Sequence, residues 1–218
     1  MSATNSQTDL KPLKITCTST KCEDNLHCFR QSGRIAKTTG SSGGKCRSCG
    51  AQLVNWDRVH QRNLNDVGYT IEALKYELIR HYFWHIPLSE YAINYARRKG
   101  KVALRIAVQK QIRNAVANPD HPLQGRQTPR ETSPHATVVH YSQHATASCC
   151  RRCLEEWHGI PMNEHLNEEQ IEYLTDLSMR YIEGRLPDLN EQPVQVPRRG
   201  PRQAATQEAL RLELPHAG

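Results

Sequence analysis

The stretch QHATASCCRRCLEEWHGI, residues 143–160, holds three cysteines and two histidines in one short segment. Cys150 and Cys153 are separated by two residues, which is the spacing of a zinc knuckle. His144 lies six positions before Cys150, and His158 lies five positions after Cys153. These donors predict a Cys2His2 metal site on a short strand–loop–helix unit. The predicted ligands are His144, Cys150, Cys153 and His158, with Cys149 and His140 in reserve.

A second group of cysteines lies near the N-terminus. Cys46 and Cys49 have the same two-residue spacing, and Gly50 permits the left-handed turn that a knuckle needs. Six donors compete here for four tetrahedral positions. The predicted ligands are Cys22, Cys28, Cys46 and Cys49, with Cys17 and His27 in reserve. We expect this closed site to be structural, because its binding free energy supports the folding of a segment with little core.

Composition supports metal at both places. Hydrophobic residues make up 37% of the 218 residues, and chains short of apolar surface often recruit metals or disulfides. The N-terminal residues 1–14 contain no signal-peptide core, and no run approaches the roughly 18 apolar residues that span a bilayer. We therefore expect a cytoplasmic protein with no membrane partner, in which cysteines stay reduced. Zn²⁺ at two sites is the expected cofactor, and an iron–sulfur cluster is the alternative.

The formal net charge of +7 favours contact with phosphate groups of nucleic acid. The alternative is a basic surface that only keeps the protein soluble, and cations at a helix end also complement the helix dipole. The candidate nucleic-acid-binding residues lie in two basic segments: Arg97, Arg98, Lys99 and Lys101, then Arg151 and Arg152.

Hydrophobic periodicity predicts a mostly α fold with small zinc-stabilised loop or β elements. A helix should follow Gly68 and end before Pro87, and two more should occupy 89–100 and about 102–117. Residues 138–141 have strand propensity, and Asn167 should cap a further helix with Gln170 in a capping box. The expected organisation is a disordered leader at 1–14, a zinc-knuckle unit at 15–65, a helical segment at 66–118, a linker or loop at 119–135, a second Cys/His unit with its C-terminal helix at 136–186, and a disordered tail at 187–218.

Residues 143–161 resemble the core of a family of uncharacterised bacterial proteins known only as a domain of unknown function. Its hallmark is a sequence close to QHATATCCRxCLEKWHGIP followed by an acidic helix, and the match covers about 60 residues of the C-terminal half. The resemblance implies no activity. It implies that His144, Cys149, Cys150, Cys153 and His158 are the Cys/His set of that family. The N-terminal cluster and the helices at 70–117 lie outside the resemblance.

Three functions fit these patterns. The favoured hypothesis is a zinc-binding protein of bacterial type that binds nucleic acid. The second is a metal-dependent hydrolase or nuclease centred on the second cluster, with Glu155 or Glu156 as general base. Enzyme activity is the less favoured interpretation, because no HExxH, P-loop or nucleophile-elbow motif occurs. The third is a zinc-assembled adaptor that docks a protein partner on the helix at 102–117.

Overall fold

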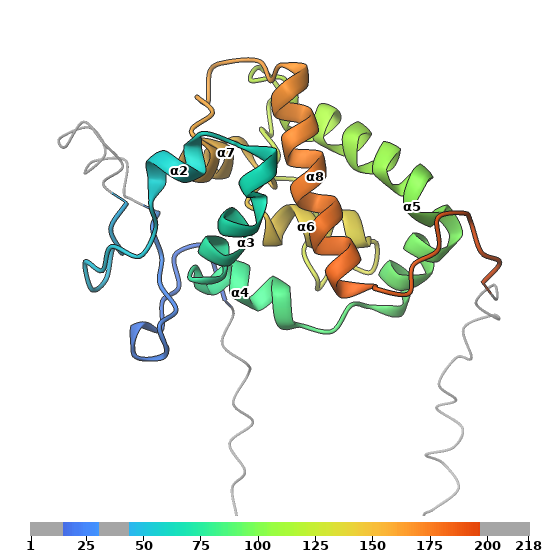
Figure 1. Ribbon diagram of the computed structural model, residues 1–218, viewed down its shortest axis with the longest axis horizontal. Helices are drawn as coiled ribbons and strands as arrows, with labels where there is room; N and C mark the ends of the chain where they lie inside the picture. Colours follow the sequence, from blue (N-terminus) through green and yellow to red (C-terminus); the bar gives the residue numbers. More distant parts are fainter. Residues whose placement is uncertain (1–14, 31–43, 197–218) are drawn as a thin grey trace, which may run out of the picture.

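The computed structural model describes residues 15–30 and 44–196 (Figure 1). Their regular structure is helical, and β pairing among them is limited to two isolated bridges. The elements are η1 (Cys22–Asp24), α2 (Trp56–His60), η2 (Leu64–Asp66), α3 (Val67–Lys75), α4 (Leu78–His85), α5 (Glu90–Ile112), the π-helical turn η3 (Arg113–Ala117), α6 (Val138–Ala145), α7 (Arg151–His158) and α8 (Glu168–Arg185). The mostly α prediction is confirmed.

The expected strand at 138–141 is wrong, because these residues begin helix α6. The backbone N–H of Thr137 donates to Nδ1 of His140, 3.0 Å away, and this capping box starts the helix. Seven of the eight residues of α6 are buried. A segment buried on all sides has no alternation that separates strand from helix. In Figure 1, α6 lies behind α8 at the centre of the fold, and it packs against α4, α5 and α8.

The single helix expected between Gly68 and Pro87 is two helices, α3 and α4, with a break at Tyr76 and Glu77. The backbone of His27 occupies this break. Its N–H donates to the Tyr76 carbonyl at 2.7 Å, and its carbonyl accepts from the Leu78 N–H at 2.9 Å. The N-terminal segment is therefore attached to the helical domain by main-chain hydrogen bonds.

The two helices expected at 89–100 and 102–117 are the two parts of α5, and Gly100, whose backbone is not helical, separates them as expected. Gly100 has a φ of +66°, and the segment 190–192 packs against its Cα. The Lys101 N–H donates to the Asn190 carbonyl at 2.9 Å, and Leu189 is buried. The expected tail therefore does not begin at 187, because 187–196 packs on α5. Residues 197–218, like the expected leader at 1–14, lie outside the described residues.

Helix α8 runs across the middle of the molecule, beside α5 and over α6 (Figure 1). Asn167 and Gln170 form the expected capping box. Leu174, Leu177 and Ile182 are fully buried on its inner face, as their helical spacing predicts. Within the described residues, no helix is long and apolar enough to cross a membrane.

Replacing Gly100 with alanine should lower the free energy of unfolding by about 2–4 kcal/mol. A Cβ there would lie 2.5 Å from the Gln192 carbonyl carbon, and the positive φ is unfavourable for alanine. Gly68→Ala is the matched control, because nothing lies within 4 Å of its added Cβ. The control should raise stability by about 0.5–1 kcal/mol in urea unfolding. Equal effects of the two substitutions would contradict the role of Gly100.

Candidate metal sites

The first candidate site brings together Cys22, His27, Cys46 and Cys49, whose donor atoms all lie within 4.8 Å of one another. The sulfurs of Cys22 and Cys46 are 3.8 Å apart, and Cys49 Sγ lies 3.4 Å from His27 Nδ1. Zn–S bonds of about 2.3 Å in a tetrahedron place two sulfurs about 3.8 Å apart. This set could hold a zinc ion with four protein ligands.

The knuckle at Cys46 is built by local backbone geometry. Gly50 has a φ of +77°, and its N–H donates to the Cys46 carbonyl at 2.9 Å. Burial acts to raise the pKa of Cys46, but hydrogen bonds from the backbone of Cys28, Cys49 and Ser48 lower it to about 6. Cys46 is thus a thiolate at neutral pH, the form that binds metal.

Cys28, a predicted ligand, lies outside this group, and the reserve donor His27 takes its place. The Cys28 thiol donates to the carbonyl of Cys17 at 3.2 Å, and burial raises its pKa to about 11. His27 pairs with Glu77 in an isolated bridge, and neighbouring side chains of an extended segment point in opposite directions. The side of this extended segment that faces Cys46 therefore carries the His27 side chain.

The second candidate site consists of Cys149, Cys150 and Cys153. Cys153 Sγ lies 3.6 Å from Cys149 Sγ and 3.3 Å from Cys150 Sγ. Cys150 is the N-cap of α7, and Cys153 lies one turn into this helix. Among the described residues no fourth Cys, His, Asp or Glu side chain joins the group. Cys149, a reserve donor in the sequence analysis, is part of it.

The histidines predicted as ligands of this site are core residues with other partners. His144 stacks on Phe83, with ring centroids 4.6 Å apart, and its Nε2 donates to the Pro129 carbonyl. His158 is fully buried, and its Nε2 donates to the Thr146 carbonyl at 2.9 Å. Burial lowers the pKa of both histidines to about 4. The Cys2His2 set is therefore not assembled. The reserve donor His140 caps α6.

Two arginines contact the Cys153 thiol, and sequence reasoning missed both. Nη2 of the fully buried Arg80 lies 3.2 Å from Cys153 Sγ, and Nη2 of Arg30 lies 3.1 Å from the same sulfur. Hydrogen bonds from the Cys149 and Cys150 thiols, and then the charges of Arg80 and Arg30, hold the pKa of Cys153 well below its usual value. No local pattern links these arginines to the cysteines, because they are far apart in sequence.

Arg80 also makes a buried ion pair. Its Nε donates to Glu77 Oε2 at 2.9 Å, and both side chains are almost fully buried. The Trp157 indole N–H donates to the same carboxylate oxygen at 2.8 Å, and Arg80 Nη1 donates to the His144 carbonyl at 2.6 Å. One guanidinium thus connects α4 with α6 and with the thiols of the second site.

The two candidate bases differ in position. Glu156 accepts hydrogen bonds from Arg30 at 3.0 Å and from Arg152 at 2.9 Å, so it is connected to Cys153 through Arg30. Glu155 is exposed and accepts from the Met162 N–H. Of the two candidate bases, Glu156 is therefore the one linked to the second site.

The six cations predicted to bind nucleic acid do not share one surface. Arg151 is fully buried, and it donates to the Val116 carbonyl at 2.9 Å and to the carbonyls of 161, 162 and 164. The prediction that Arg151 contacts nucleic acid is therefore wrong. Arg152 pairs with Glu156. Lys101 lies 3.3 Å from Glu191. The cations that remain on the surface of α5 are Arg97, Arg98 and the half-buried Lys99.

The two candidate sites are close neighbours in the fold. The Phe29 ring packs against Trp56 and Trp157, with centroid distances of 5.6 and 5.9 Å. Cys46 of the first site and Cys153 of the second belong to the same apolar cluster as these rings. A structural change at one site should therefore reach the other through aromatic packing.

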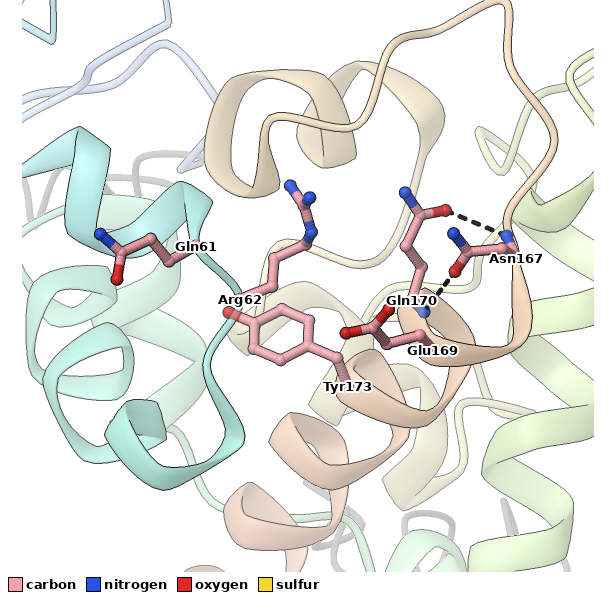
Figure 2. Close-up of a pocket in the computed structure, with 6 residues that line it drawn as sticks. All are labelled: Gln61, Arg62, Asn167, Glu169, Gln170 and Tyr173. Atoms are coloured by element: carbon pink, nitrogen blue, oxygen red, sulfur yellow. Dashed lines mark hydrogen bonds between the residues drawn. The ribbon is translucent and has the colours of Figure 1, made fainter.

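A small hollow lies between the end of α2 and the start of α8 (Figure 2), and a larger, more open hollow of about 440 Å³ adjoins it at Asn63 and Leu64. The volume of the small hollow is about 60 Å³, which is room for a few water molecules. Figure 2 shows that two of its polar side chains, Asn167 and Gln170, are engaged in the capping box of α8. This hollow does not present a ligand site comparable to the thiol clusters.

Arg80→Met should lower the free energy of unfolding by about 3–5 kcal/mol, because it leaves the Glu77 carboxylate buried without its cation. The double variant Glu77→Gln/Arg80→Met should recover part of this loss. Lys75→Met is the control, because the Lys75–Glu72 pair lies at the surface and should contribute less than about 1 kcal/mol. Urea unfolding of the four proteins measures these differences. An Arg80→Met variant no less stable than the control would refute the role of the buried pair.

A protein-family model, described as domain of unknown function DUF4186, matches residues 68–183. The match contains Arg80, the three thiols of the second site and α8, whereas the first site lies before it. No solved structure matches the chain. The matched region covers more than half of the sequence and includes the resemblance at residues 143–161. It also includes the helices at 70–117, so placing them outside the family was wrong. The chain therefore belongs to the DUF4186 family, a family of unknown function.

Proposed function

We propose that this chain is a zinc protein in which Cys22, His27, Cys46 and Cys49 bind one structural zinc ion. The convergence of four donor atoms within 4.8 Å carries the proposal. A site closed by four protein ligands has no position for a substrate, which is typical of structural zinc. Its binding free energy then contributes to folding.

The zinc ion would attach the N-terminal segment to the family domain. His27 is both a ligand of the group and the residue whose backbone fills the break between α3 and α4. Phe29 and Arg30 lie two and three residues further along the chain, and they contact Trp157 and Glu156 on α7. Fixing His27 therefore fixes the two residues that reach the second site.

Cys46→Ser should lose about one zinc ion per chain and melt at least about 5 °C lower than the unaltered protein. The physical reason is the loss of one of four ligands and of the folding free energy that the ion supplies. Cys28→Ser is the matched control, because Cys28 is buried near the site but lies outside the donor group. Metal analysis and thermal melts measure both effects. Loss of zinc in Cys28→Ser with retention in His27→Gln would contradict the proposed ligand set.

We also propose that nucleic acid binds along α5. Arg97 and Arg98 are exposed there, and a shallow hollow lies beside them. Tyr95, Lys99 and Lys110 are among the residues that line this hollow. Cations that contact phosphate next to an aromatic ring are typical of surfaces that bind single strands. The observation that favours this function is the joint exposure of these cations on one helix.

Arg97→Ala/Arg98→Ala should weaken binding to single-stranded DNA about 3–10-fold at low salt. It should also reduce the slope of log K against log[salt] by about 1–2, because fewer phosphates are neutralised. Arg58→Ala/Lys75→Ala removes the same charge from α2 and α3 and serves as the control. Fluorescence anisotropy at several salt concentrations measures both quantities. If both double variants weaken DNA binding equally, the binding is non-specific charge attraction and the proposed site on α5 is wrong.

A further inference from the structure

We propose that Cys149, Cys150 and Cys153 form an open metal site. Three thiolates hold one zinc-class ion, and the fourth coordination position takes an oxygen or sulfur donor of a small molecule from outside the chain. This inference goes beyond the structural zinc proposed above and does not rest on it, because the two sites share no ligand.

The sulfur geometry is that of a site for one ion. The Sγ atoms of Cys150 and Cys149 lie 3.3 and 3.6 Å from Cys153 Sγ. These distances are close to the sulfur–sulfur separation of about 3.8 Å at a tetrahedral zinc ion. An iron–sulfur cluster distributes its cysteines over several iron atoms. Its ligands would not converge on one point in this way. The three thiols are therefore placed for a single soft ion.

In the part of the chain that the structure describes, no Cys, His, Asp or Glu side chain supplies a fourth donor. The donor atoms of His144 and His158 lie outside the group of converging thiols. Cys17, whose carbonyl accepts from Cys28, lies outside the group of converging thiols. Residues 31–43, which lie outside the described residues, contain no Cys, His, Asp or Glu. A zinc ion with three protein ligands keeps a position for water or substrate.

The two arginines suit an ion with Lewis-acid character. Arg30 and Arg80 both donate to Cys153 Sγ. Such hydrogen bonds withdraw electron density from a thiolate, so the metal keeps more positive charge for its fourth ligand. Cys150 is only half-buried, whereas Cys149 and Cys153 are buried, so solvent reaches the site on the Cys150 side. Water is the resting ligand, and a small thiol or oxygen donor can replace it.

Cobalt substitution of the full chain tests the open site. The metal-free protein is loaded with Co²⁺ without oxygen, and thiolate-to-cobalt absorption is recorded. Cys150→Ser should remove the part of this absorption that belongs to the second site. Adding 2-mercaptoethanol should raise that part by about one third, because the number of thiolates increases from three to four. The first site, closed by four ligands, should not respond.

Cys17→Ser is the decisive control. It should leave the second-site absorption and its response to 2-mercaptoethanol unchanged. A site closed by Cys17 as fourth ligand would lose part of this absorption and would respond to 2-mercaptoethanol only after the substitution. Absence of any absorption sensitive to Cys150→Ser, or formation of a Cys150–Cys153 disulfide in place of metal binding, would overturn the proposal. Cobalt absorption that is lost in Cys46→Ser reports the structural site separately. Failure of either proposal is therefore visible on its own.

Discussion

The buried charge of Arg80 is the constraint on which the rest of the structure depends. A guanidinium without solvent must have its charge balanced and its donors satisfied. Here Glu77, the His144 carbonyl and the Cys153 sulfur provide these partners, and each comes from a different part of the chain. Burial raises the pKa of Glu77, while Arg80 opposes that shift. Helices α4, α6 and α7 must therefore meet at one place.

This meeting point explains the irregularities around it. Glu77 is the extended N-cap residue of α4, and the break there separates α3 from α4. The break frees the Tyr76 carbonyl and the Leu78 N–H, which the backbone of His27 then satisfies. The proposed structural zinc ion binds the side chain of the same residue, His27. The N-terminal segment thus reaches the family domain at the position where the helices are least regular.

Local signals predicted the parts of the fold that depend on neighbouring residues. The capping box at Asn167, the buried stripe of α8 and the Cys46–Cys49 knuckle all follow from short-range spacing. The strand expected at 138–141 failed because burial on every side removes the periodic pattern. The break at Gly100 was predicted, but the packing of the distant residues 191 and 192 against it was not, because no local pattern reports that contact.

The sequence by itself determined that soft metal donors gather in two regions and that most of the chain is helical. Only the tertiary structure decided which donors converge. His27 replaces Cys28 because the bridge to Glu77 sets the direction of its side chain. His144 and His158 lie outside the second site because His144 stacks on Phe83 and the Nε2 of each ring donates to a backbone carbonyl. Ligand choice depends on side-chain direction and on competing partners, and contacts between distant segments set both.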